Sequence, residues 1–397
     1  MNSFWGAPRK SHYPIENRRI AAYTNRTPRI ITWCFVTSFF RNLIIGGVVL
    51  TLAPYAAQAG PSPRVTGSLS VEIQNDNTFH ADDLSEERNE LGTLTEASVS
   101  VLLAKGLSIN TGLTFEAVTD PRPSEDRVFQ DHGLYVEVAT LSYETDRFSL
   151  YAGKFGPNFS IAFDAAAGVY GTDMSEDDVE LAEFVGFGGS YTIGQTALGS
   201  LTASASLFTA DRSALSNSIF TKRGRTSLDD AGPGNTRGLK SFAVALDGDS
   251  IKGLDGLRYH IGFAKLGTEG GLAERRLAIA AEWAIATAAG VTVTPLLEYV
   301  RFWQAGGNAG ENRHYYTVSL MTEYRRWNIA LAYTGRTARQ AAPQPMALSL
   351  SNSRQFQVSA GYSFTDNLSL DIGYKVAREG GSTSKTAGAL LAYGLAF

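Results

Sequence analysis

Acidic side chains are concentrated in one stretch of the sequence, between Gly156 and Glu183, which contains no Lys or Arg. Carboxylates gathered at this density attract cations, because each one lowers the electrostatic energy of a nearby positive charge. Three structures would explain the pattern: a solvated acidic loop, a divalent-cation site, or a narrow cation-attracting passage. The acidic residues of the stretch are Asp164, Asp173, Glu176, Asp177, Asp178, Glu180 and Glu183.

Motifs that would indicate an enzyme are absent from the sequence. It has no Gly-x-Ser-x-Gly, no His-Glu-x-x-His, no phosphate-binding loop and no Cys-x-x-Cys. Four histidines follow residue 59, and we expect three of them, His80, His132 and His314, in loops. An Asp-His or Ser-His-Asp arrangement there could catalyse hydrolysis, but lone loop histidines are mostly solvated. We therefore expect no enzymatic activity, no catalytic residue, no metal site and no cofactor.

The overall composition limits the class of protein. The chain has 397 residues, of which 19% are charged and 11% aromatic, and it contains 40 Gly and one Cys. A mean hydropathy of -0.10 excludes a bundle of many apolar membrane helices, and the aromatic content excludes a disordered chain. A formal charge of -4 gives no support to nucleic-acid binding. The remaining class is a β-protein with one wet face and one apolar face.

The first 59 residues have the pattern of a secretory signal peptide. Arg41 precedes an apolar run from Leu43 to Leu52, and Ala57-Gln58-Ala59 follows as a small-x-small cleavage site. The run is too short for a transmembrane anchor. The apolar run starts far from Met1, which indicates a misassigned start or an extended leader. Cleavage would remove the single cysteine and leave 28 Lys+Arg against 38 Asp+Glu, a formal charge of -10.

The remainder, 60–397, reads as a series of strands. From Ala387 to Phe397, bulky residues alternate with small ones, which is the period of a strand. The same alternation marks sixteen segments in all, although fourteen or eighteen are alternatives because the stretch from Ala197 to Lys240 is ambiguous. The predicted strands start near Val65, Leu91, Leu107, Leu134, Phe148, Phe184, Leu201, Leu239, Leu257, Arg275, Val291, Tyr315, Asn328, Ser353, Leu368 and Thr386.

Strand length and loop pattern favour a membrane barrel over a soluble sandwich. The strands run for about ten residues, and short turns alternate with long polar connections, as in outer-membrane barrels. Aromatic residues also recur near strand ends, as in the interfacial girdles of such barrels. The predicted fold is therefore all-β: a transmembrane, antiparallel, up-and-down β-barrel of sixteen strands. The long connections expected are Asn77 to Glu90, Thr119 to Gly133, Gly156 to Glu183, Asp211 to Gly238 and Ala338 to Asn352.

Strand alternation also predicts which charges face the barrel interior. Glu72, Glu96, Glu116 and Glu137 lie on the polar face of the first four strands. Arg276, Arg336 and Lys375 lie on the polar face of later strands. An acidic wall opposite a basic wall across a narrow pore would create a transverse field. A sixteen-stranded barrel leaves an aqueous channel, so these charges can remain solvated.

The chain resembles the Gram-negative general porins over the whole of 60–397. The resemblance rests on the leader, the strand count, the terminal Tyr393-x-Leu395-x-Phe397, and a 28-residue connection after the fifth strand, which ends in Tyr151-Ala152-Gly153-Lys154-Phe155. The porin Pro-Glu-Phe-Gly-Gly turn is absent, and Gly168-Val169-Tyr170-Gly171 is a loose counterpart. The resemblance implies that Gly156 to Glu183 folds into the lumen as a constriction. It also implies that Tyr393, Leu395 and Phe397 signal to the barrel-assembly machinery, and that the protein is a homotrimer.

Together, these observations predict a passive outer-membrane channel for small hydrophilic solutes and ions, with mild cation selectivity. The expected surroundings are the outer-membrane lipid and lipopolysaccharide of a Gram-negative bacterium. A substrate-selective channel is the nearest alternative. A barrel without a channel, acting as an enzyme or as a surface or adhesion protein, is the alternative from another class.

Overall fold

The computed structural model describes residues 64–230, 232–339 and 352–397, apart from the side chains of Glu176 and Asp177. The predicted signal peptide lies outside the described residues, as does most of the connection predicted between Ala338 and Asn352. Within the described residues, no helix is long and apolar enough to cross a membrane.

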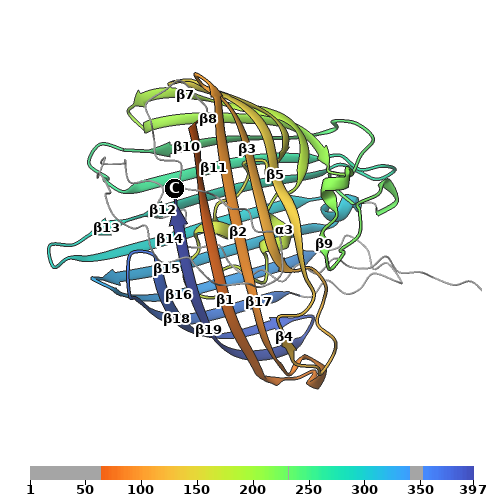
Figure 1. Cartoon of the computed structure of the whole chain (residues 1–397), viewed down its shortest axis with the longest axis vertical. Coiled ribbons are helices and arrows are strands. Elements are labelled where there is room, and N and C mark those ends of the chain that lie inside the picture. The colour runs from red at the N-terminus through yellow and green to blue at the C-terminus, as the bar shows by residue number, and fades with distance from the viewer. Residues whose placement is uncertain (1–63, 231, 340–351) are drawn as a thin grey trace, which may run out of the picture.

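The fold is a closed antiparallel barrel of sixteen strands, as predicted (Figure 1). Each predicted strand start falls within four residues of the observed one. The wall strands are β1 (Arg64–Ala81), β2 (Arg88–Ala104), β3 (Leu107–Ala117), β5 (His132–Glu144), β6 (Phe148–Phe155), β7 (Phe184–Thr196), β8 (Gly199–Ala210), β10 (Ser241–Asp249), β11 (Leu257–Leu266), β12 (Glu274–Trp283), β14 (Val291–Trp303), β15 (Asn312–Tyr324), β16 (Trp327–Arg339), β17 (Ser353–Ser363), β18 (Leu368–Glu379) and β19 (Ser382–Ala396).

Short elements decorate the connections between these strands. Two α-helices of four residues each lie in the connection between β6 and β7, and three two-residue strands pair with the edges of longer ones. The short elements are β4 (Arg127–Val128), β9 (Ile219–Phe220), β13 (Ile285–Ala286), α2 (Ala162–Ala165), α3 (Glu176–Val179), η1 (Leu84–Glu86), η2 (Ala214–Ser216), η3 (Leu228–Asp230) and η4 (Ala305–Gly307).

Alternation along each strand separates an apolar outside from a polar inside. On β16, the outward residues are large and exposed, whereas the inward residues are small or polar and buried, which is the pattern of a barrel wall in lipid. The outward set is Trp327, Ile329, Leu331 and Tyr333, and the inward set is Asn328, Ala330, Ala332 and Thr334. The exposed apolar face is therefore the outer surface of the barrel.

The barrel closes between its first and last strands. β1 pairs with β19 from Ser68 to Ala81, and Gly67 exchanges two backbone hydrogen bonds of 2.9 Å with Phe397. A side chain at Gly67 would collide with the Phe397 ring, because an ideal Cβ there lies 2.6 Å from Cζ. The terminal aromatic residue thus covers the seam at its short-turn end, next to the first turn of the wall.

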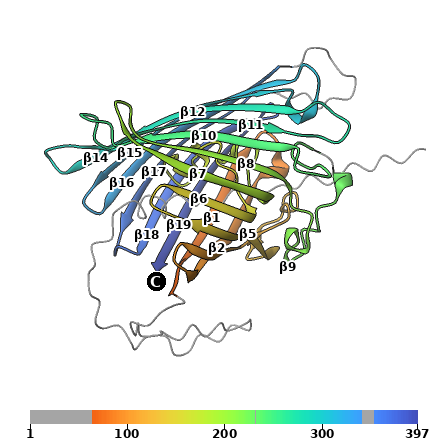
Figure 2. The ribbon, with the colours of Figure 1, turned by 90° about the horizontal axis from the view of Figure 1, so that it is seen from above.

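The two ends of the barrel differ, as predicted, with tight turns at one end and most long connections at the other (Figure 2). One predicted long connection is wrong: β1 continues to Ala81 and β2 starts at Arg88, so most of Asn77 to Glu90 is paired strand. Asn75 and Asn89 exchange side-chain hydrogen bonds across this pair. Polar side chains were taken as a loop signal, but they also suit strands that rise beyond the membrane into water.

The histidines expected in loops lie in strands instead. His80 is in β1, His132 begins β5, and His314 is in β15. His314 receives a hydrogen bond at 2.7 Å in a contact with the hydroxyl of Tyr299, its neighbour on β14. These side chains are therefore spread over the barrel wall rather than gathered in one loop cluster.

Candidate pore constriction

The connection Gly156 to Glu183, hereafter the inner loop, lies inside the barrel. It begins where β6 ends at Phe155, and Figure 1 shows its helix α3 within the ring of strands. Its first anchor is Glu298 on β14, which is buried. Glu298 accepts hydrogen bonds from the Ser160 hydroxyl at 2.8 Å and from the backbone of Ile161 at 2.9 Å and Ala162 at 3.2 Å. One wall carboxylate therefore satisfies three donors of the loop.

A second anchor lies beside the first. His260 on β11 contacts the carbonyl oxygen of Phe159 through Nε2 and Oδ1 of Asp247 on β10 through Nδ1, both at 2.7 Å. Asn158 donates to the other oxygen of Asp247 at 2.9 Å. The start of the inner loop is thus held to β10, β11 and β14 by polar side chains that alternation turns inward.

The middle of the inner loop crosses to the seam of the barrel. Gln357 on β17 accepts from the backbone of Tyr170 at 3.2 Å and donates to the carbonyl of Ala167. Gly168 has a φ of +96°, and a Cβ there would lie 2.4 Å from the Gln357 amide, so only glycine fits. Tyr170 is fully buried and donates from its hydroxyl to Asp76 on β1 at 2.8 Å. Burial and the Asp76 carboxylate hold the pKa of Tyr170 above its ordinary value.

Two acids of the inner loop pair directly with basic residues of the wall. Asp173 forms an ion pair with Lys375 on β18 at 2.7 Å. Asp178 forms ion pairs with Arg313 on β15 at 3.1 Å and Arg336 on β16 at 3.0 Å. Arg276 on β12 donates to the backbone carbonyl of Asp178 at 2.7 Å. We call Arg276, Arg313, Arg336 and Lys375 the clamped arc.

The predicted basic wall residues therefore touch the inner loop rather than facing it across open water. Arg276, Arg336 and Lys375 all make these contacts, and Arg313 joins them without having been predicted. Among the other predicted loop acids, Asp164 lies in α2 and Glu180 follows α3, both partly buried. The side chains of Glu176 and Asp177 lie outside the described residues.

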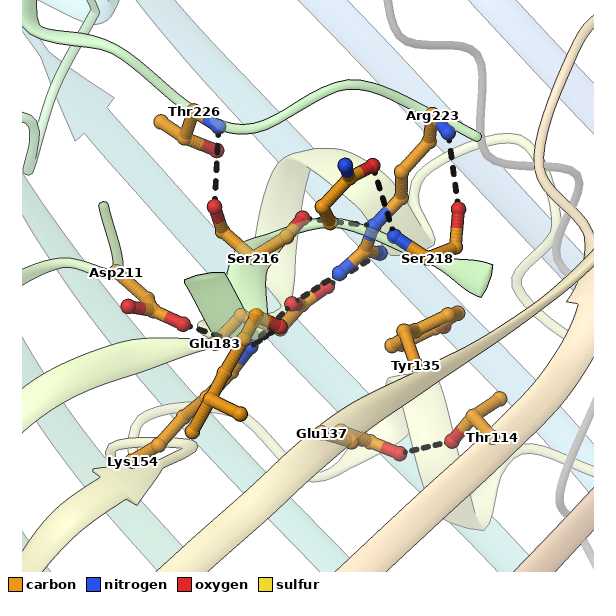
Figure 3. Close-up of polar contacts among 12 residues, drawn as sticks. Thr114, Tyr135, Glu137, Lys154, Glu183, Asp211, Ser216, Ser218, Arg223 and Thr226 are labelled. Atoms are coloured by element: carbon orange, nitrogen blue, oxygen red, sulfur yellow. Dashed lines mark hydrogen bonds and ion pairs between the residues drawn. The ribbon is translucent and has the colours of Figure 1, made fainter. Parts of the chain in front are cut away.

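Glu183, the last acid of the inner loop, belongs to a buried charge cluster that we call the latch (Figure 3). Lys154 on β6 is only 2% exposed and pairs with Glu183 at 2.7 Å and with Asp211 at 3.0 Å. Arg223 binds both oxygens of Glu183 and stacks 3.7 Å over the Tyr135 ring. Gly153, with a φ of +135°, interrupts strand alternation just before Lys154. The latch consists of Lys154, Glu183, Asp211 and Arg223.

The latch ties the connection 211–240 to a short section of wall. β6 has 8 residues, whereas β5 and β7 have 13 each, because the chain leaves the wall at Phe155. Strand β9 supplies part of the missing pairing, with Ile219 and Phe220 opposite Leu134 and Gly133 of β5. The connection 211–240 thus covers the place where the inner loop departs.

Asp211 of the latch remains ionised in this setting. Burial would raise the pKa of its carboxyl, but hydrogen bonds from the backbone and hydroxyl of Ser213 and from the Lys154 ammonium lower it below its ordinary value. The Ser213 backbone bond measures 2.8 Å. Because the paired form is the charged one, the latch favours a carboxylate at this position.

The four predicted wall glutamates occupy the opposite arc of the interior. Glu72 and Glu116 are buried, and Glu96 and Glu137 are partly buried. Glu116 accepts a hydrogen bond from the Tyr135 hydroxyl, and Glu137 accepts one from Thr114 at 2.6 Å. Their strands β1, β2, β3 and β5 are consecutive wall neighbours. We call Glu72, Glu96, Glu116 and Glu137 the acidic arc.

A metal site receives no support from the side chains described. In that part of the chain, no group of three or more His, Cys, Asp or Glu residues could hold a metal ion. The inner-loop acids whose partners are shown bind Lys, Arg and Tyr side chains instead.

Comparisons with known proteins agree on the fold. No family model matches the sequence, and no curated protein matches it. Among solved structures, OprB of Pseudomonas putida has a TM-score of 0.60 at 9% identity, over 84% of this chain and 94% of that one. The outer membrane channel DcaP of Acinetobacter baumannii gives 0.56 at 12%, over 87% and 100%. OmpF of Salmonella typhi, in complex with daunomycin, gives 0.56 at 12%, over 85% and 98%.

These similarities extend over nearly the whole described chain. At such low identity they show the fold alone, which is the sixteen-stranded barrel of Gram-negative outer-membrane porins. The fold implied by the sequence resemblance is therefore confirmed.

Proposed function

We propose that the protein is a water-filled outer-membrane channel for passive diffusion of small hydrophilic solutes and ions. The observation that carries the proposal is the inner loop, a 28-residue segment held within the barrel by polar contacts to strands on several sides. A barrel that only anchored an external activity would need no such internal structure. No enzymatic activity and no cofactor form part of the proposal.

We further propose mild cation selectivity, set mainly by the acidic arc. The inner-loop acids Asp173 and Asp178 are ion-paired with the clamped arc, so their charges are largely compensated. The acidic arc has no comparable row of bases on its own strands. A unit charge at 4 Å contributes about 1 kcal/mol in water and about 4 kcal/mol at an effective dielectric constant of 20. Several such carboxylates beside the pore would favour cations several-fold.

A substrate-selective channel is the second candidate, and the latch favours it. Arg223 brings a guanidinium from the connection 211–240 to Glu183, on the same side as the acidic arc. Opposite charges at a narrowed mouth would orient a polar solute that carries both signs. Competition between ion flow and candidate solutes would distinguish this function from general diffusion.

Assembly features complete the proposal. The terminal Tyr393, Leu395 and Phe397 serve as the signal to the barrel-assembly machinery, after export directed by residues 1–59, and the mature protein forms a homotrimer in the outer membrane. Removal of Phe397 should reduce the yield of heat-modifiable, membrane-inserted protein. An unchanged yield, or a monomer by cross-linking in mild detergent, would contradict the respective part.

Planar-bilayer conductance tests the proposed channel. The purified, folded protein should insert to give stepwise currents with a large unit conductance in potassium chloride. Heat-denatured protein at the same concentration is the control for leakage caused by detergent. A folded, heat-modifiable barrel that inserts without current steps would contradict a channel and favour an enzyme or a surface protein.

A further inference from the structure

A pair of arginines faces outward at the long-loop end of the barrel. Arg354 on β17 and Arg378 on β18 are direct cross-strand partners, and both side chains are exposed. Like charges directly opposite each other on one sheet face are destabilising. The pair therefore has a use for a negative partner that the neighbouring wall does not provide.

Carboxylates are not placed to compensate this pair. Among the described residues, neither guanidinium forms an ion pair. Glu379, next to Arg378, responds to the charges of the inward-facing Lys375 and Arg336. The segment 340–351, which precedes β17, contains no Asp or Glu in its sequence. The positive charge thus remains on the outer surface.

The two arginines border a hollow in that surface. A cavity of about 300 Å³ is lined by Arg354 and Arg378 together with Tyr333, Phe356, Val376 and Thr383. Small residues flank the arginines, since Gly335 lies opposite Arg354 and Thr383 lies opposite Arg378.

An apolar floor lies below the arginines, toward the middle of the membrane. Tyr333 and Phe356 are cross-strand partners, both more than 40% exposed on the outer face. Val376 continues the row on β18 and has Lys385 opposite it on β19. The surface therefore combines basic groups at the level of lipid headgroups with aromatic and aliphatic groups at the level of acyl chains.

We propose that this hollow binds the phosphate of an anionic lipid in the outer leaflet, with Arg354 and Arg378 on the phosphate and the acyl chains along Tyr333, Phe356 and Val376. The planar guanidinium matches phosphate oxygens in a two-pronged fashion, and basic clusters at a membrane surface recruit acidic headgroups. Because long loops mark the extracellular end, the lipid belongs to the outer leaflet. The site rests on the outer-membrane location of the proposed function but not on ion conduction.

Binding of a defined lipid to the intact barrel tests the site. The probe is bisphosphorylated lipid A, added to the detergent-purified protein and quantified by native mass spectrometry. Fully dephosphorylated lipid A, with identical acyl chains, is the matched probe. The unmodified protein should bind the phosphorylated form at least tenfold more tightly. Equal binding of the two forms would overturn the proposal without any variant being needed.

Variants then locate the site. The double variant R354Q/R378Q should bind the phosphorylated probe about 25-fold more weakly, because each basic residue near an anionic headgroup contributes roughly fivefold. The control K105Q/K252Q removes two exposed positive charges from short turns at the other end and should bind normally. T383E places a carboxylate beside Arg378 and should also weaken binding, which provides a second test if the double variant does not fold.

Three results would count against the site. Normal phosphorylated-lipid binding by both R354Q/R378Q and T383E would exclude these arginines. Equal weakening by K105Q/K252Q would indicate a nonspecific charge effect. A change in oligomeric mass on R354Q/R378Q substitution, seen without lipid, would assign the surface to a contact between copies of the chain. Conductance steps that persist while lipid binding is lost would separate this proposal from the proposed channel.

Discussion

The acidic arc and the clamped arc face the same lumen but use their charges differently. Arg313, Arg336 and Lys375 of the clamped arc bind carboxylates of the inner loop at 2.7 to 3.1 Å. In the acidic arc, Glu116 and Glu137 accept hydrogen bonds from neutral hydroxyl groups of the wall. One set of charges is therefore committed to holding the loop, and the other can act on permeating ions. The sign of the pore field does not follow from counting charged residues alone.

The largest effect on this contrast should come from Glu298, the anchor that holds the start of the inner loop. E298A leaves three loop donors without their acceptor, and each hydrogen bond to a charged group contributes about 1.5–3 kcal/mol. We expect the loop to detach, with larger and noisier conductance steps and faster cleavage within the loop by added protease.

E282A is the matched control for E298A. Glu282 faces inward on the neighbouring strand β12, and its ion-pair partner is Arg258 on β11. This variant should keep the unmodified conductance. Unchanged conductance and cleavage in folded E298A would show that the anchor does not hold the loop in place.

The next effect concerns the clamp itself. D178N removes the carboxylate shared by Arg313, Arg336 and the Tyr315 hydroxyl while preserving the size of the side chain. Two guanidinium groups then lose their counter-charge, at about 1 kcal/mol or more for each close contact. We expect the reversal potential at low salt to move several-fold toward anions.

D366N is the control for D178N, because Asp366 is exposed in a short turn between β17 and β18. It should leave the reversal potential unchanged. The same shift in both variants would mean that the overall charge of the protein, rather than the clamp, sets selectivity.

A complementary effect is expected from the acidic arc. Replacing all four glutamates by glutamine, in E72Q/E96Q/E116Q/E137Q, should abolish most of the cation preference and leave the unit conductance within about twofold, because side-chain size is kept. The matched control replaces four exposed carboxylates near short turns: E144Q, D146N, D249N and E323Q. Selectivity that survives in the first variant would remove the acidic arc from the proposal.

The smallest effect concerns the latch and pH. Asp211 has a pKa below its ordinary value, so its contribution to stability is fully present above the unfolded-state pKa of about 3.9 and is lost as pH falls through the lower folded value. A spin label at K222C should therefore stay immobile at pH 5 and become mobile only in stronger acid. D211N should be mobile already at pH 7, whereas D229N, in the same connection, should match the parent protein.

The strands could be predicted from the sequence because their signal is local. Alternation places outward and inward residues within each strand, as on β16, and needs no knowledge of the partner strand. The prediction failed at Asn77 to Glu90, since composition alone does not distinguish a water-exposed strand from a loop. Closure between Gly67 and Phe397 was consistent with the even strand count but its contacts were not predictable.

The pairing of charges was not predictable for the opposite reason. Asp178 and Arg336 were both identified, but their contact spans 158 residues and depends on the path of the inner loop. Glu298 carries no motif that marks it as an anchor, and Lys154 is directed into the latch after a glycine that interrupts alternation. Long-range contacts of this kind require the fold before they can be assigned.

The sign of the reversal potential of the unmodified protein is the most direct test of the central claim that the acidic arc sets the pore field. It should be measured for single channels across a tenfold potassium chloride gradient. We predict cation selectivity at low salt that fades as the salt concentration approaches 1 M, where the Debye length falls to about 3 Å. An anion-selective reversal potential at low salt would contradict the account.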